Sequence, residues 1–154
     1  MALFYGTYLN KVDRKGRVSV PAAFRAVLDK RSAAGIVLRP SHKAPALDIY
    51  TVEYFESLNS RLGEMDVFSD EQDELALALF GDARELMFDS EGRIMLPRDL
   101  MDKIGIDANA AFIGRGESFQ VWEPATAEAH KRAAIERARA KGVTLPKSSA
   151  AGPA

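Results

Sequence analysis

Residues 13–25 read DRKGRVSVPAAFR, and residues 89–101 repeat the same pattern as DSEGRIMLPRDLM. At an offset of 76 residues, both stretches have Asp, Gly, Arg and Pro at the same four positions, with apolar residues matched between them. Identities at such fixed spacing indicate an internal duplication. A half-chain unit of this size has little core of its own, so we expect the two copies to complete one another.

Each copy of the motif predicts a turn, a strand and a short helix. The aspartate can accept hydrogen bonds from the backbone amides that follow it, and the glycine allows the positive φ that closes the turn. After the turn, apolar and polar residues alternate, which predicts a strand with one buried face. The proline that follows suits a helix start, so helices are expected over 22–31 and 98–104. The residues assigned to this turn geometry are Asp13, Gly16, Asp89 and Gly92.

The remainder of each copy predicts two more strands and a helix. Expected strands are 35–38 and 48–50 in the first copy, and 111–113 and 118–122 in the second, with residues 39–47 as a long loop. Helices are expected over 54–62, 70–80 and 125–141, with Thr51 and Thr126 as N-caps. The fold class is therefore α+β, mainly β: a β-barrel of pseudo-two-fold symmetry built from two repeats, with flanking helices.

This pattern divides the chain into five segments. We expect a first repeat at 1–55, a helical connector at 56–82, a second repeat at 83–126, a C-terminal helix at 127–143 and a disordered tail at 144–154.

Charge is distributed unevenly, although the net charge is only −1. Residues 1–45 carry nine basic and two acidic side chains, and residues 46–128 carry six basic and nineteen acidic ones. Residues 129–154 carry six basic and one acidic. This asymmetry indicates either a face that binds a polyanion or self-association of opposite charges, with solvated surfaces as the alternative.

Composition argues against several classes of protein. The 154 residues include no cysteine and only two histidines, far apart, so we expect no thiol nucleophile, no metal site and no cofactor. No nucleotide-binding or metalloprotease motif is present and no nucleophile–base pair is evident, so neither an enzyme nor a small-molecule substrate is expected. Without a long apolar run or a signal peptide, the expected location is the cytoplasm, with no membrane partner.

The motif Asp-x-x-Gly-Arg-[Val/Ile]-x-[Val/Leu]-Pro resembles the signature of the AbrB/SpoVT superfamily, whose swapped-hairpin barrels bind DNA. Two copies, together with FYGTY at 4–8 and LFGDA at 79–83, resemble the MraZ family over about residues 1–140. The resemblance implies a nucleoid-associated bacterial transcriptional regulator of the division and cell wall gene cluster. It further implies double-stranded DNA as partner, with short direct repeats in the protein's own promoter bound by a ring of many subunits.

The resemblance places DNA contacts at the two Asp-x-x-x-Arg turns. The first turn region is basic, with Lys11, Arg14 and Lys15, whereas the second has Ser90 and Glu91. Because acidic groups repel phosphate, we expect the first copy to make most of the phosphate contacts. The relatives are often Arg-rich in the helix before LFGDA, but here 70–74 is acidic, which leaves a role in subunit contact open.

Arg17 and Arg93 have two open interpretations. Each guanidinium can bind a phosphate or a guanine edge, and each can instead pair with Asp13 or Asp89 across its own turn. The DNA-binding residues expected from the sequence are Lys11, Arg14, Lys15, Arg17 and Arg93. A protein-interaction module of the same fold, antitoxin-like or docking subunits without specific DNA readout, is the alternative function.

Overall fold

The computed structural model describes residues 2–31, 33 and 35–147. Within them are five helices: α1 (Ala22–Lys30), α2 (Val52–Leu62), α3 (Asp70–Phe80), α4 (Arg98–Ile104) and α5 (Pro124–Lys141). The described strands are β1 (Thr7–Lys11), β2 (Arg17–Ser19), β3 (Ile36–Pro40), β4 (Leu47–Thr51), β5 (Arg84–Leu86), β6 (Arg93–Met95), β7 (Asn109–Gly114) and β8 (Phe119–Trp122). Met1–Pro124 form one compact unit, and Ala125–Ala154, which hold nearly all of α5, form a second.

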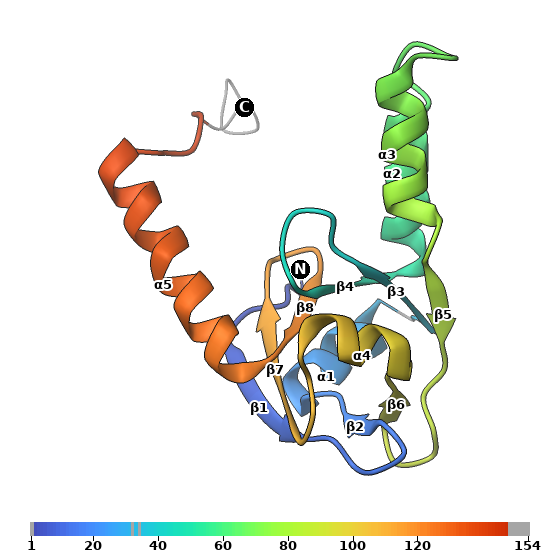
Figure 1. Ribbon diagram of the computed structural model, residues 1–154, viewed down its shortest axis with the longest axis vertical. Coiled ribbons are helices and arrows are strands. Elements are labelled where there is room, and N and C mark those ends of the chain that lie inside the picture. Colours follow the sequence, from blue (N-terminus) through green and yellow to red (C-terminus); the bar gives the residue numbers. More distant parts are fainter. Residues whose placement is uncertain (1, 32, 34, 148–154) are drawn as a thin grey trace. The chain divides into compact units, whose positions relative to one another are not determined.

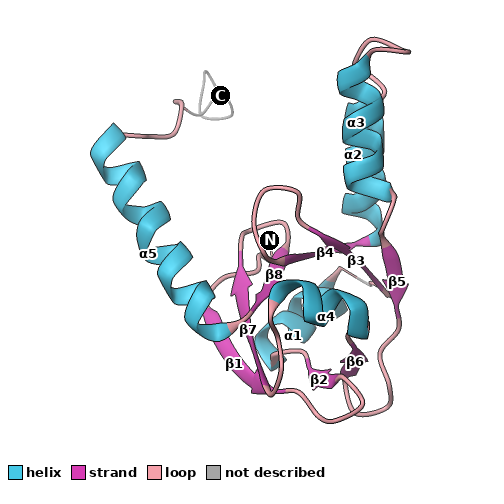
Figure 2. Ribbon diagram, viewed as in Figure 1, coloured by secondary structure: helices cyan, strands magenta, loops and turns pink. Residues whose placement is uncertain are grey.

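Strand pairing confirms the α+β fold and shows how the two copies are joined. Six strands form an antiparallel sheet in the order β1-β7-β8-β4-β3-β5, and β2 pairs with β6 in a separate two-stranded ribbon (Figure 2). The first strand of each copy pairs with the third strand of the other copy, as β1 with β7 and β5 with β3. The order of the sheet is therefore unchanged when the copies are exchanged.

Closure of this sheet into the expected barrel is not confirmed. In the described part of the chain β1 and β5 are the two edge strands, with no pairing between them, so the sheet is open. The expected pseudo-two-fold symmetry is evident in the ribbon, where Val18 lies opposite Ile94, its counterpart at the offset of 76 residues. The two copies therefore meet directly at their repeated motifs.

The core confirms the alternation expected from the sequence. Val18, Val20, Ile94 and Leu96 are each no more than 1% exposed. Phe24 of α1 completes this core from the helix side, with its ring centroid 4.8 Å from that of Phe119 in β8. Because each copy supplies strands and a helix to this shared core, neither can bury its apolar face alone.

Two expectations about individual residues are wrong. Arg39, placed in a loop, is the fourth residue of β3 and is 5% exposed. Thr126, expected as an N-cap, lies inside α5, which begins at Pro124 because proline suits the first helical turn. Thr51 does cap α2, accepting from the backbone N–H of Tyr54 at 3.2 Å. In the expected tail, residues 144–147 have no regular secondary structure, and residues 148–154 lie outside the described residues.

The buried guanidinium of Arg39 is surrounded by polar groups that it can bind. Its Nη2 is 3.1 Å from Asp48 Oδ2, its Nε donates to the Tyr50 hydroxyl at 3.2 Å, and its Nη1 donates to the Ala78 carbonyl of α3 at 3.1 Å. Asp48 Oδ1 also accepts from Gln120 Nε2 at 2.6 Å. Burial raises the pKa of the Tyr50 hydroxyl. This network ties α3 to β3, β4 and β8.

In the described residues, no helix is long and apolar enough to cross a membrane.

Candidate nucleic-acid interface

The β2–β6 ribbon brings the two repeated turns together. Residues 13–17 form the first turn, which leads into β2, and residues 89–93 form the second turn, which leads into β6. Figure 1 shows the ribbon at the end of the fold opposite the α2–α3 hairpin. The sequence placed the turns 76 residues apart, and strand pairing between the copies makes them parts of one surface.

The aspartate organises the first turn. Asp13 Oδ1 accepts from the backbone N–H groups of Lys15 at 2.9 Å and Arg17 at 2.8 Å, and Asp13 Oδ2 accepts from Arg17 Nε at 2.7 Å. Gly16 closes the turn with a φ of +88°. The hydrogen bond from the backbone N–H of Arg17 is the main cause that lowers the pKa of Asp13. One carboxylate therefore fixes both the turn and the direction of the arginine side chain.

The second turn repeats this geometry. Asp89 Oδ1 accepts from the backbone N–H groups of Glu91 at 2.8 Å and Arg93 at 2.9 Å, and Asp89 Oδ2 accepts from Arg93 Nε at 2.8 Å. The backbone N–H of Arg93 is the main cause that lowers the pKa of Asp89. Because these bonds form within five residues, each copy builds its turn without help from the rest of the fold.

Each turn is also attached to the other copy. The carbonyl of Gly16 accepts from the backbone N–H of Leu96 at 2.8 Å, and the carbonyl of Gly92 accepts from that of Val20 at 3.3 Å. A Cβ atom on Gly16 would lie 2.9 Å from the Leu96 carbonyl oxygen. The glycine is therefore needed both for its positive φ and for this close approach.

The electrostatic environments of the two turns differ. Lys11, Arg14 and Lys15 are exposed, and among the described residues none of them forms an ion pair. In the second turn, Arg93 Nη2 is 2.9 Å from Glu91 Oε2, in addition to its bond with Asp89. Two carboxylates therefore hold Arg93, and its pKa is raised, mainly by the Asp89 hydrogen bond. In the described chain Arg17 forms an ion pair with Asp13 alone, and the hydrogen bond between the two side chains runs through Arg17 Nε and not through a terminal nitrogen.

Sequence reasoning missed two cations at this surface. Arg98, an exposed residue at the start of α4, donates from Nη2 to the carbonyl of Arg14 at 2.8 Å. Arg25 of α1 lies against Gly92, where a glycine Cβ would be 2.8 Å from its Nη1. Each arginine comes from the copy other than the turn it touches. The internal duplication could have identified these two arginines, because pairing of β2 with its counterpart β6 puts the helix of one copy beside the turn of the other.

The outward face of the ribbon offers groups that suit a DNA groove. Val18 and Ile94 point into the core, so the side chains of Arg17, Ser19, Arg93 and Met95 lie on the opposite face. The major groove of B-DNA admits a two-stranded β-ribbon, and arginine can bind a guanine edge bidentately there. The described residues include no group of three or more histidine, aspartate or glutamate side chains placed to hold a metal ion.

Comparison with known proteins agrees with this geometry. A family model described as "MraZ protein, putative antitoxin-like" matches residues 79–142. The chain is 44% identical to a protein named transcriptional regulator MraZ from Gluconacetobacter diazotrophicus, over 95% of this chain and 93% of that protein. Proteins of the same name from Gluconobacter oxydans and Rickettsia rickettsii are 43% and 39% identical, over 90% and 94% of this chain and 87% and 97% of their own lengths. The chain therefore belongs to the MraZ family.

Proposed function

We propose that this protein is a sequence-specific, DNA-binding transcriptional regulator and that the β2–β6 ribbon is its DNA-binding surface. The observation that carries the proposal is the set of exposed cations without ion pairs in the described chain, Lys11 at the end of β1 and Arg14 and Lys15 in the turn that leads to Arg17 on this ribbon. The names of its relatives, transcriptional regulators, support the same class and not an enzyme. The cations bind phosphate, while the ribbon face reads base edges.

The ion pairs assign different tasks to the two arginines. Arg17 keeps its terminal nitrogens available, so it contacts DNA while Asp13 orients it. Arg93 is held by Asp89 and Glu91, so its first task is to maintain the second turn, with any DNA contact secondary. Arg98 adds a cation beside the first turn. The first copy therefore supplies most of the phosphate binding.

The proposed target is the promoter of the protein's own gene within the division and cell wall gene cluster, at tandem short repeats on the nucleoid in the cytoplasm. A few phosphate contacts per subunit give weak, salt-sensitive binding. A ring of subunits, each a two-repeat unit of 1–55 and 83–126 joined by the connector 56–82, raises the affinity for tandem sites by multivalency. This is a physical reason for a ring-forming protein to recognise repeated sequences.

The decisive experiment is a titration of the full chain against its own upstream promoter DNA and a scrambled duplex, at several salt concentrations. The test variant is Arg14→Ala with Lys15→Ala, and the matched control is Ser90→Ala with Glu91→Ala at the same positions of the second turn. If both cations contact phosphate, the test variant should lower the slope of log affinity against log salt by about 1.8, at about 0.9 per contact. The control should not lower it.

An unchanged salt slope in the Arg14/Lys15 variant would refute the assignment of the first turn. Equal weak binding of the wild-type protein to both duplexes would refute sequence-specific recognition. The second result would favour the alternative function, a protein-interaction module, for which the family description "antitoxin-like" and the opposite charges of 1–45 and 46–128 are the supporting observations. The basic turn would then be a docking surface for an acidic protein.

A further inference from the structure

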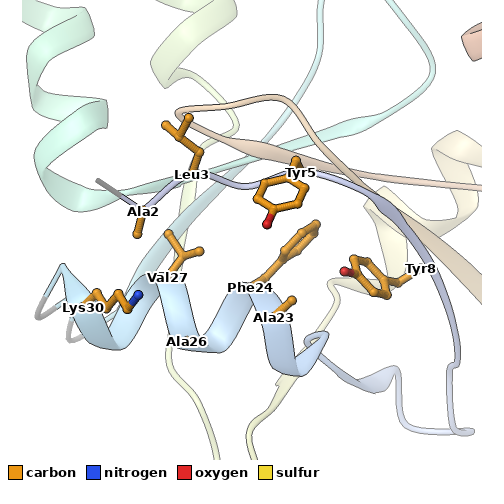
Figure 3. A pocket seen from close by; sticks show the side chains of 9 residues that line it. All are labelled: Ala2, Leu3, Tyr5, Tyr8, Ala23, Phe24, Ala26, Val27 and Lys30. Atoms are coloured by element: carbon orange, nitrogen blue, oxygen red, sulfur yellow. The ribbon is translucent and has the colours of Figure 1, made fainter.

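A groove between the N-terminal segment 2–8 and α1 exposes apolar and aromatic side chains. It has a volume of about 270 Å³, and its main lining residues are Leu3, Tyr5, Tyr8, Phe24, Val27 and Lys30. Figure 3 shows the rings of Tyr5, Phe24 and Tyr8 gathered on one side, with the Lys30 ammonium at the other end. Tyr5 is 77% exposed and Leu3 42%, so this apolar surface has no cover within the described chain.

The groove is built to keep its shape. Phe24 forms the floor at 1% exposure, and the Tyr8 ring meets it edge-on at 5.3 Å between centroids. Gly6, with a φ of +95°, lies directly against the Tyr8 ring. A preformed aromatic groove with a cation at one end suits an aromatic side chain accompanied by a carboxylate.

The loop between α2 and α3 carries such a pair of groups. Phe68 is 96% exposed, and Val67 beside it is 65% exposed. Phe68 also has a φ of +71°, an unfavourable conformation for a bulky residue. Ser69 caps α3, so Phe68 is the residue before the cap. A side chain at that position can pack locally against an apolar residue at the fourth position of the helix, but here that position holds the charged Asp73. Nothing in its own hairpin therefore explains the position of the Phe68 ring.

Charge complements shape at these two surfaces. Residues 52–80, which form the hairpin, carry eight acidic side chains and one basic, whereas the charged residue that lines the groove is the basic Lys30. Asp66 is exposed two residues before Phe68, and Lys30 is exposed in the groove without an ion pair in the described chain. Opposite charges of this kind steer association and fix its direction.

From these observations we infer that the Phe68 loop of one subunit docks into the Tyr5–Phe24 groove of the next subunit. The inference rests on the proposed self-assembly and names the surfaces that produce it. Figure 1 shows the loop at the far end of the hairpin from the sheet, away from α1 of the same chain. Because loop and groove are different surfaces, the contact is head-to-tail, and such contacts close into rings when the rotation allows it.

On the subunit that supplies the loop, the contact leaves the ribbon accessible, because the hairpin and the ribbon lie at opposite ends of the fold (Figure 1). It also gives the acidic stretch at 70–74 a role in subunit contact instead of DNA binding. A single aromatic side chain buries about 150–250 Å², whereas a specific interface buries about 800 Å² per partner. The flanks of the loop must therefore contribute, and the assembly should depend on concentration.

Sedimentation velocity and light scattering of the full chain without DNA test this contact. Phe68→Gly and Tyr5→Ser should each reduce the assembly to single chains. Their matched controls are Leu77→Ser on the same hairpin and Leu9→Ser near the groove, at sites 66% and 65% exposed, and these should keep the wild-type size. The melting temperature of a single Phe68→Gly chain should not fall below that of single Tyr5→Ser chains, because glycine adopts a positive φ without strain.

Mixing the two defective variants tests the direction of the contact. A Phe68→Gly chain keeps its groove and a Tyr5→Ser chain keeps its loop, so an equimolar mixture should form dimers and nothing larger. The inference would be overturned if the wild-type protein is a single chain in solution or if the variants are as large as the wild type. It would also be overturned if the mixture stays dissociated or assembles to the full wild-type size.

The same variants separate this inference from the proposed DNA binding. Phe68→Gly leaves the ribbon untouched, so it should bind a duplex with one repeat at the affinity of a wild-type subunit while losing the gain from tandem repeats. If Phe68→Gly keeps the wild-type size while the Arg14/Lys15 variant loses DNA, the docking contact is wrong and the DNA surface stands. If the sizes change as expected but the wild-type protein binds DNA non-specifically, the docking contact stands and the proposed sequence-specific DNA binding is wrong.

Discussion

Replacing Arg39 with methionine should strongly destabilise the fold, because it leaves the Asp48 carboxylate buried without its cation. Both side chains are only 6% exposed, and Arg39 Nη2 lies 3.1 Å from Asp48 Oδ2. After the substitution, Asp48 keeps the hydrogen bond from Gln120 Nε2 at 2.6 Å, and its nearest remaining cation is Arg115 Nη1 at 3.9 Å. The Ala78 carbonyl in α3 also loses the donor that connects the hairpin to the sheet.

The size of the effect follows from this geometry. Removing one partner of a buried ion pair costs about 3–5 kcal/mol. That is a large share of the roughly 5–15 kcal/mol by which a domain is stable. For a chain of this length, each kcal/mol lowers the melting temperature by about 2–4 °C, so Arg39→Met should lower it by roughly 6–20 °C.

Thermal and urea unfolding followed by circular dichroism measure this loss. Removing both charges in Arg39→Met with Asp48→Leu should recover most of it, because no unpaired charge is then left in the interior. Arg84→Met, which breaks the exposed pair with Asp99, serves as the control and should change the melting temperature little. A loss below about 1 kcal/mol in Arg39→Met would refute the reasoning, because the pair would then behave like a surface ion pair.

Three further predictions concern the turns and the exposed ion pairs. Gly16→Ala should lower the free energy of unfolding in urea more than Gly92→Ala. The new Cβ meets a backbone oxygen at 2.9 Å in the first case, whereas in the second it meets the Arg25 side chain, at 2.8 Å from Nη1 and 2.9 Å from Cδ, which can shift more readily than backbone. Equal losses would contradict this. Arg84 lowers the pKa of Asp99 to about 2, so the stability that this pair contributes should be present above pH 3.8 and lost as the pH falls through about 2. In NMR titrations, Arg84→Ala should move the Asp99 pKa back towards 3.8, and an unmoved value would exclude the pair as the cause. Arg17→Ala should weaken binding to the promoter duplex by about 1–3 kcal/mol if Arg17 contacts a base, and a normal affinity with a lowered melting temperature would assign it to structure alone.

Local pattern was enough to predict the repeated turns. The hydrogen bonds that form each turn join residues within one five-residue segment, 13–17 or 89–93. The geometry of the turn is therefore specified by residues that are neighbours in the sequence. Alternation after each turn likewise predicted which side chains are buried, and Thr51 was recognisable as a helix cap. These features depend on neighbours in sequence, which is why they can be read without a structure.

Arg39 shows where that reasoning fails. A charged residue next to a proline indicates a loop, and only the approach of Asp48, Tyr50 and Ala78 makes burial of its guanidinium favourable. Asp48 and Tyr50 are about ten residues away in the sequence, and Ala78 belongs to helix α3, 39 residues away. No local pattern carries this information.

The sequence by itself determined that there are two copies, where each turn lies and which copy is basic. Tertiary structure determined that the copies exchange strands, that Arg98 of the second copy lies on the turn of the first, and that Arg25 of the first copy lies against Gly92 of the second. The reason is physical: turns and alternation arise from bonds between near neighbours. The ribbon, its charge and the separation of the Phe68 loop from it arise from the pairing of strands far apart in the chain.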